Sequence, residues 1–132
     1  MSTDALQLAA ELGQNDAHRR QAAAERLATM AEEAAPAAVV LVSASGDEDD
    51  VVREWAVSAL EGMGPPPESA LPELVTLLDA EHSDVIYWAA TLLGRLEDRA
   101  ADASAALSAA AAKVENAAAK KRIAWALGKT QQ

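Results

Sequence analysis

Apolar residues along the chain fall into short and long segments that alternate. The short segments carry apolar side chains at i, i+3 and i+4, as at Leu71, Leu74 and Leu78, and this spacing gives a helix one buried face. A polar turn follows each short segment and leads into a longer one. We predict that the long segments form helices over residues 17–31, 51–63, 85–97 and 117–129. The pattern therefore predicts four pairs of helices, about eight helices in all.

The helix pairs recur at a fixed step along the sequence. Two columns of leucines are spaced by 33 residues: Leu8, Leu41, Leu74 and Leu107, and Leu27, Leu60 and Leu93. A period in the thirties is the signature of stacked repeats, in which each unit buries its apolar face against its neighbours. We therefore predict an all-α, right-handed α-α superhelix (a solenoid) in a single domain, residues 1–132. Its four repeats would cover about residues 4–34, 35–69, 70–102 and 103–132.

Polar residues and prolines mark the helix starts. We expect N-caps at Asp16, Asp50, Asp84 and Asn116. Their short side chains can accept hydrogen bonds from the first free N–H groups of a helix. Pro36 and Pro72 lie near the starts of short helices, where a missing N–H has no cost. Gly64–Pro67 ends the second long helix. Because the 33-residue step continues across this segment, we interpret it as a loop inside one solenoid.

Composition supports an all-helical, intracellular protein. Alanine, the best helix former, is abundant, and phenylalanine and cysteine are absent. Without cysteine there are no disulfides or thiolate metal sites. The first residues carry Asp4 and Glu11 and no basic segment, so they do not match a signal peptide. The longest uncharged run, residues 34–46, is shorter than the roughly 20 residues of a membrane span. We expect a soluble, cytoplasmic protein that does not enter a membrane.

Charge is strongly negative and unevenly distributed. The formal net charge is −10, which disfavours nucleic acid and anionic membranes as partners. The cluster Lys120–Arg122 is too small to reverse this. Most of the acidic side chains lie in residues 1–103, whereas the charged side chains of residues 104–132 are mainly Lys and Arg. We interpret this as a solvated surface, with the alternative that the basic end docks an acidic surface of another copy in a weak, salt-sensitive self-association.

The long segments resemble a known repeat family. Residues 51–64, VVREWAVSALEGMG, resemble the second-helix signature of HEAT repeats, in the short variety also found in phycobilisome lyase-like proteins. That signature runs as Asp, then Val-Arg, two variable residues, two small residues, one variable residue, Ala-Leu and a nearby Gly. It is matched by Asp50, Val52, Arg53, Ala56, Val57, Ala59, Leu60 and Gly64. The third repeat has Ile86 where Arg is expected. The resemblance covers essentially the whole chain and implies a fold rather than a function, because the family binds unrelated partners.

The resemblance also implies where a partner would bind. In this family the second helices line the concave surface, so their variable positions are the usual contact residues. Nine such positions form the candidate site: Glu54, Trp55, Ser58, Tyr87, Trp88, Thr91, Lys121, Arg122 and Trp125. They include every aromatic side chain of the chain, and aromatic residues and Arg dominate binding hot spots. We expect Trp55 and Trp88 to stack in adjacent repeats, with Arg122 on the indole of Trp88. The alternative, in which the indoles fill gaps left by alanine in the core, stays open.

No motif points to catalysis, a metal or a cofactor. The chain has no GxSxG, GxGxxG or Walker loop. The acidic run Asp47–Asp50 lacks the spacing of a calcium loop, because position 6 is Val52 and position 12 is Ser58; we interpret the run as a turn that caps a helix. His18 and His82 lie near turns and form no zinc motif. We predict no cofactor and no bound metal.

These observations predict a non-enzymatic protein-interaction scaffold that binds a peptide or helix on its concave face. One alternative is a lyase-like or chaperone-like helper that presents a small cofactor or chromophore to a partner protein, as some relatives of the short repeat type do. A second alternative is a self-associating accessory domain. The sequence does not name the partner.

Overall fold

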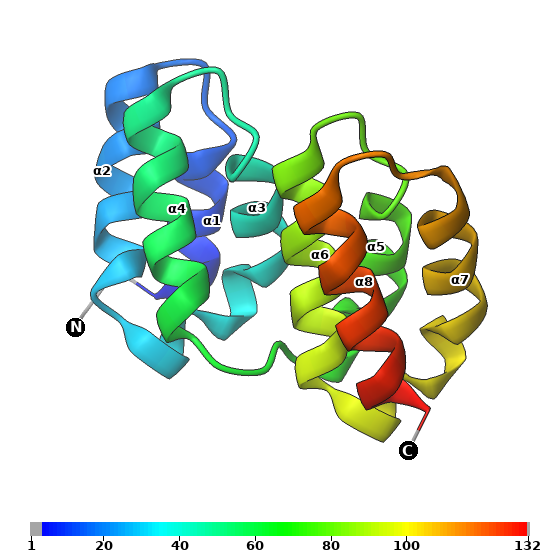
Figure 1. The fold of residues 1–132 in the computed structure, drawn as a ribbon. Helices are drawn as coiled ribbons and strands as arrows, with labels where there is room; N and C mark the ends of the chain where they lie inside the picture. Colours follow the sequence, from blue (N-terminus) through cyan, green and yellow to red (C-terminus); the bar gives the residue numbers. More distant parts are fainter. Residues whose placement is uncertain (1–3, 132) are drawn as a thin grey trace. The chain divides into compact units, whose positions relative to one another are not determined.

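The computed structural model describes residues 4–131, so residues 1–3 and 132 of the predicted domain lie outside the described part. Within it the chain is helical and has no strand (Figure 1). The eight α-helices of this part are α1 (Ala5–Leu12), α2 (Ala17–Ala28), α3 (Ala38–Ala44), α4 (Asp50–Gly62), α5 (Leu71–Leu77), α6 (Ser83–Arg95), α7 (Ser104–Lys113) and α8 (Ala117–Thr130). No described helix is both long enough and apolar enough to cross a bilayer. The predicted all-α fold with about eight helices is confirmed.

The chain divides into two compact units, residues 1–64 (unit 1) and residues 65–132 (unit 2). Unit 1 contains α1 to α4, and unit 2 contains α5 to α8. In each unit every short helix packs against the long helix that follows it, and the two long helices lie side by side, α2 with α4 and α6 with α8. Each unit is therefore two stacked helix pairs. That one domain continues across the Gly64–Pro67 loop stays a prediction.

The leucines of the 33-residue columns form the cores of the units. The buried members are Leu8, Leu27, Leu41 and Leu60 in unit 1 and Leu74, Leu93 and Leu107 in unit 2. In α8, Ile123 is fully buried, whereas Leu127 is half-buried. Burial of one leucine side chain stabilises a fold by about 1.5–3 kcal/mol, so the columns hold the pairs together in both units. Alanines between them let the helices approach closely.

The N-caps confirm two sequence predictions and correct two. Asp16 and Asn116 cap α2 and α8, and each side chain accepts a backbone N–H. The cap of α4 is Asp49 rather than Asp50, because Asp49 Oδ1 accepts from the N–H groups of two following residues at 3.0 Å. The cap of α6 is His82 rather than Asp84, with Nδ1 accepting from an N–H at 3.2 Å. Both predicted residues lie in the first turn instead, where a negative charge favours the helix dipole.

The first three long helices end in a common way. Ala31, Gly64 and Glu97, spaced by 33 residues, have φ angles of 52°, 76° and 55°, the left-handed conformation that often closes a helix. Glycine adopts this conformation without strain, whereas in Ala and Glu the Cβ atom is crowded by the backbone, which raises the energy of the conformation. Ala31 and Glu97 then begin 3₁₀ helices, Ala31–Ala37 and Glu97–Ala103, that lead into α3 and α7. The sequence pattern gave no sign of these 3₁₀ helices.

Candidate functional site

A guanidinium group lies between two aromatic rings in unit 2. Arg122 of α8 donates a hydrogen bond from Nη2 to the hydroxyl oxygen of Tyr87 on α6, at 2.9 Å. Its guanidinium carbon lies 4.9 Å from the centre of the Tyr87 ring and 4.8 Å from the centre of the Trp125 ring. All three side chains are half-buried. Cation–π attraction on both sides and the hydrogen bond together hold the group in one orientation. We call these three residues the aromatic–arginine cluster.

Gly94 gives Trp125 its position. A Cβ atom on this glycine would lie 2.9 Å from Cε3 and Cη2 of the Trp125 indole, closer than real Cβ contacts allow. The indole therefore packs directly against the backbone of α6. Arg122 and Trp125 are three residues apart on α8 and so share one helix face. The close approach of the two helices at Gly94 thus fixes one ring of the cluster.

A shallow hollow of about 280 Å³ opens beside the cluster. Its lining comprises Tyr87, Ala118, Lys121, Arg122 and Trp125. Four of these five were predicted from the sequence, and Ala118 was not, because an alanine carries no chemical signal. Its spacing of three, four and seven residues from the others marks one face of a helix, and that spacing would have found it.

Two buried residues of α6, Trp88 and Thr91, contact Tyr87 of the cluster. Trp88 is only 8% exposed and Thr91 only 4%. The Trp88 ring meets Tyr87 edge to face, with 5.4 Å between ring centres, and Thr91 Oγ1 donates to the Tyr87 carbonyl at 2.7 Å. Arg122 lies on Tyr87 and Trp125, not on Trp88 as expected, because Trp88 is buried and Arg95 lies over its ring instead, at 5.8 Å. Arg95 is two turns further along α6, a spacing that would have indicated the pair.

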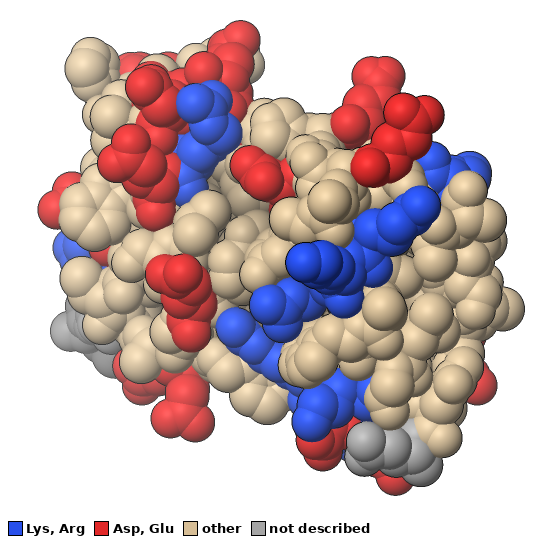
Figure 2. Space-filling model, in the orientation of Figure 1, with Lys and Arg blue, Asp and Glu red and all other residues tan. Residues whose placement is uncertain are grey.

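The remaining predicted site residues lie on exposed faces of the long helices. In unit 1, Glu54 and Ser58 of α4 are exposed and Trp55 is half-buried. In unit 2, Lys121 is exposed. The expected stacking of Trp55 on Trp88 joins residues of different units and stays a prediction. Figure 2 shows Lys and Arg side chains gathered in a band over unit 2, where α8 contributes Lys120, Lys121, Arg122 and Lys129.

Unit 1 joins its two repeats by an ion pair at the turns. Arg20 of α2 donates from Nε and Nη2 to the Asp47 carboxylate at 2.9 and 3.1 Å. Its Nη1 donates to the carbonyls of Gln14 and Asn15 at 3.0 and 2.8 Å. This side chain is buried, with the residue 8% exposed. The hydrogen bonds that Arg20 donates to the Asp47 carboxylate raise the pKa of Arg20 above its usual value. The pair was not predicted, although the signature Arg of the family could have indicated it.

The acidic run at the start of α4 is a structural turn, as predicted. The pKa of Asp49 is lowered from its usual value, first by the hydrogen bond from the Val52 N–H and further by Gln21, the Val51 N–H and Arg20. Gln21 Nε2 reaches both oxygens of Asp49 at 3.2 Å. The carboxylates of Asp47 and Asp49 thus bind protein groups. In residues 4–131, no three His, Cys, Asp or Glu side chains are placed to hold a metal ion.

Comparisons with solved structures identify the fold. An engineered protein solved by the Northeast Structural Genomics Consortium is 24% identical over 98% of the chain and 63% of its own length, with a TM-score of 0.56. A second such protein is 22% identical over 97% of the chain and 38% of its own length, with a TM-score of 0.60. A designed armadillo repeat protein, solved in complex with the peptide (KR)4, is 20% identical over 94% of the chain and 63% of its length, with a TM-score of 0.55. The chain thus spans less than two thirds of these proteins.

The same comparisons settle the class of fold but not a function. The structural similarity at this identity confirms the predicted repeat-solenoid class. No curated protein matches the sequence. The model of the family described as HEAT repeats matches residues 38–128, well over half of the chain. The matched range includes the buried leucines of both columns from Leu41 to Leu107. The chain belongs to the HEAT repeat family.

Proposed function

We propose that the chain is a non-catalytic scaffold that binds a peptide or a helix of a partner protein through its second helices. HEAT and armadillo-like repeats commonly serve protein interaction. The proposed contact residues are Glu54, Trp55 and Ser58 of α4, Tyr87 of α6, and Lys121, Arg122 and Trp125 of α8, with the buried Trp88 and Thr91 of α6 beneath them. The aromatic–arginine cluster is the observation that carries the proposal.

The cluster has the properties of a binding hot spot. Trp, Tyr and Arg are the residue types most enriched there. Their half-exposed rings keep apolar area available to a partner, and the contacts of Arg122 with Tyr87 and Trp125 hold that area rigid before binding. A rigid surface loses little conformational entropy when a partner docks. Trp88 and Thr91 take part as supports of Tyr87 rather than as direct contacts.

Charge suggests the chemistry of the partner segment. The hollow beside the cluster is lined by Lys121 and Arg122 and by two aromatic rings. A segment with a carboxylate next to an apolar side chain would meet a cation and a ring at once. The designed armadillo repeat protein was solved in complex with the basic peptide (KR)4, so a protein of similar fold can bind a peptide. The basic face of α8 favours an acidic peptide.

Affinity capture from extracts of the source cells tests the proposal. The intact chain is compared with Arg122→Ala, which removes the group that joins the two rings. Lys129→Ala is the matched control, because it removes one cation from the last turn of the same helix, outside the cluster. Loss of a hot-spot residue costs about 2 kcal/mol or more, roughly thirtyfold in affinity. Partners captured by the intact chain and the control but lost with Arg122→Ala support the proposal. Equal capture by all three proteins contradicts it.

A further inference from the structure

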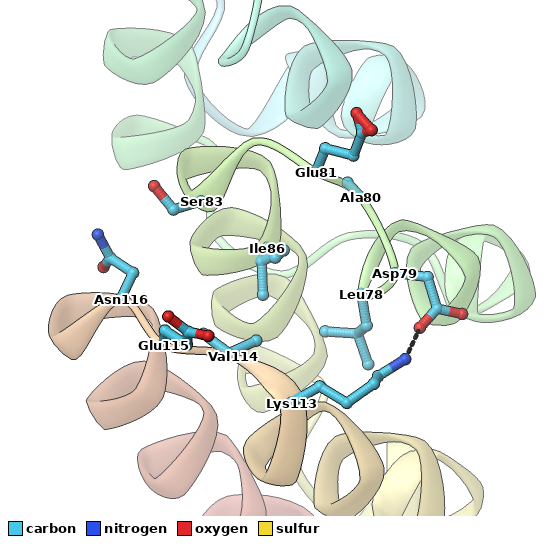
Figure 3. Close-up of a pocket in the computed structure, with 10 residues that line it drawn as sticks. All are labelled: Leu78, Asp79, Ala80, Glu81, Ser83, Ile86, Lys113, Val114, Glu115 and Asn116. Atoms are coloured by element: carbon cyan, nitrogen blue, oxygen red, sulfur yellow. Dashed lines mark hydrogen bonds and ion pairs between the residues drawn. The ribbon is translucent and has the colours of Figure 1, made fainter.

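A second hollow lies between the two repeats of unit 2, at the turns that precede α6 and α8. Its volume is about 420 Å³. Leu78, Ile86 and Val114 give it apolar walls, and the side chains of Asp79, Glu81 and Glu115 stand around them (Figure 3). Lys113 runs along one side and pairs with Asp79 at 2.8 Å. None of these residues belongs to the aromatic–arginine cluster.

The matching place in unit 1 is filled by Arg20. Arg20 is the fourth residue after its N-cap Asp16, and Ile86 is the fourth residue after its N-cap His82. The two positions are two repeats apart in the 33-residue step. Arg53, the fourth residue after Asp49, also donates to a carbonyl two residues before its cap, at 2.7 Å. An arginine therefore serves this turn in both repeats of unit 1. In unit 2 the position holds Ile86 in the first repeat and Lys120, the fourth residue after Asn116, in the second.

The turns of the two units share a backbone hydrogen bond and similar cap angles. Gln14 N–H donates to the Glu11 carbonyl and Ala80 N–H to the Leu77 carbonyl, each at 3.1 Å. The caps that follow have nearly equal backbone angles, φ −76° and ψ 115° in unit 1 and φ −82° and ψ 123° in unit 2. The carbonyls of the two residues before the cap thus belong to corresponding positions of similar turns. Arg20 binds them in unit 1.

In unit 2 these two carbonyls have no such donor. They belong to Ala80 and Glu81, both of which line the hollow. Within residues 4–131, no side chain or backbone N–H donates to either carbonyl oxygen. Unit 2 also has no carboxylate at the position of Asp47. The residue two repeats further along the 33-residue step is Lys113, and the residue two positions before the cap Asn116 is Val114. The carboxylates that remain are those of Asp79, Glu81 and Glu115, at the rim.

We propose that this hollow binds the guanidinium group of an arginine side chain from a partner protein. The group would take the role that Arg20 has in unit 1, with donors to the carbonyls of Ala80 and Glu81 and its charge beside the rim carboxylates. In unit 1 one nitrogen of Arg20 serves both carbonyls while two others bind a carboxylate. A guanidinium can thus meet the carbonyls and a rim carboxylate at once, which the compact ammonium of lysine does less well. The apolar walls of Leu78, Ile86 and Val114 would cover its aliphatic stem. The site is separate from the face proposed above and does not depend on it.

Titration with N-acetyl-arginine amide, followed by methyl NMR, tests the inference on the whole chain. The methyl signals of Leu78, Ile86 and Val114 should shift and saturate, with a dissociation constant on the order of millimolar for so small a probe. N-acetyl-citrulline amide, which has the same shape without the charge, should cause no saturable shift. N-acetyl-lysine amide should bind more weakly than the arginine probe. Arginine shifts that are absent, or matched by citrulline, would overturn the proposal.

Two variants sharpen the titration. Lys113→Glu places a carboxylate near the position of Asp47, and we expect arginine to bind roughly three- to fivefold tighter, as for an exposed ion pair. Lys129→Glu makes the same charge change in the last turn of α8 and should leave the affinity unchanged. Ile86→Arg fills the hollow from within and should abolish the shifts of Leu78 and Val114. If Ile86→Arg does not fold, as judged by circular dichroism, the two lysine variants decide. Equal effects of both would contradict a specific site.

Discussion

Unit 1 and unit 2 pack corresponding helices side by side, but different polar contacts join the two repeats of each unit. In unit 1 the link lies at the turns, where Arg20 holds the Asp47 carboxylate and two carbonyls. In unit 2 the corresponding residue is Ile86, the turns are joined by the exposed Lys113–Asp79 pair, and a part-buried hydrogen bond links Arg122 to Tyr87 along the helices. The leucine columns and the turn backbone are common to both. Two repeats can therefore stack with or without a buried arginine–carboxylate pair, and where that pair is missing a hollow is open at the turn.

The two units also differ in charge. By sequence, unit 1 has 12 acidic and four basic side chains, and unit 2 has nine acidic and seven basic ones. In unit 1 two carboxylates of the acidic run at the start of α4, those of Asp47 and Asp49, are bound within the turn. In unit 2 the cations of α8 lie on an exposed face (Figure 2). The two units thus present surfaces of different charge on similar helix pairs.

Truncation of one leucine in each unit should give the largest effect. Leu27 and Leu93 occupy the same column and are fully buried. We expect Leu27→Ala and Leu93→Ala each to lower the free energy of unfolding by about 2–5 kcal/mol, because a cavity replaces lost contacts. Urea denaturation followed by circular dichroism measures both. A large effect in one unit and almost none in the other would show that the column does not serve the two units equally.

Making unit 1 resemble unit 2 tests the role of the ion pair. Arg20→Ile leaves Asp47 and two carbonyls without their donor, and we expect a clear fall in the urea midpoint. Arg19→Ile is the control, since the Arg19–Glu11 pair is exposed, with 53% and 38% of the two side chains accessible, and exposed pairs contribute little. An Arg20 variant as stable as the Arg19 variant would mean that the apolar columns alone hold the two repeats together.

Relief of backbone strain should raise stability modestly in both units. Ala31 and Glu97 have left-handed φ angles of 52° and 55°, which cost an L-residue roughly 1–2 kcal/mol. Part of this gain is offset by the greater freedom of glycine in the unfolded chain. We expect Ala31→Gly and Glu97→Gly each to stabilise the fold by about 0.5–1 kcal/mol in thermal or urea denaturation. A loss of stability would show that the side chains make compensating contacts.

Acidification should affect unit 1 through Asp49. The pKa of this carboxyl is lower in the folded chain than in the unfolded one, where it is about 3.9. Its contribution to stability is therefore present above the unfolded pKa and is lost as pH falls through the folded pKa. Below about pH 4, Asp49→Asn should lose less stability than the intact chain, because the amide still caps α4 but does not titrate. Urea midpoints between pH 2 and pH 6 give the comparison, and parallel pH profiles would contradict it.

The sequence predicted the elements that depend on local or periodic signals. The leucine step gave the helix pairs and the core, and short polar residues gave Asp16 and Asn116 as caps. It missed Asp49 and His82 because several adjacent residues at each turn can cap, and the starting residue depends on which side chain bends back to the helix. It placed Tyr87, Arg122 and Trp125 on one face but paired Arg122 with the wrong ring, since column spacing says nothing about burial. The hollow at Ile86 could not be predicted, because the sequence pattern does not show which side chain fills the space between two turns.

Gly94 leaves no room for a side chain where the Trp125 indole touches α6. Any larger residue at position 94 would push the indole outward and loosen the guanidinium that rests on it. Among homologues, positions 94 and 125 should therefore vary as a pair, with a small residue at one accompanying a large ring at the other.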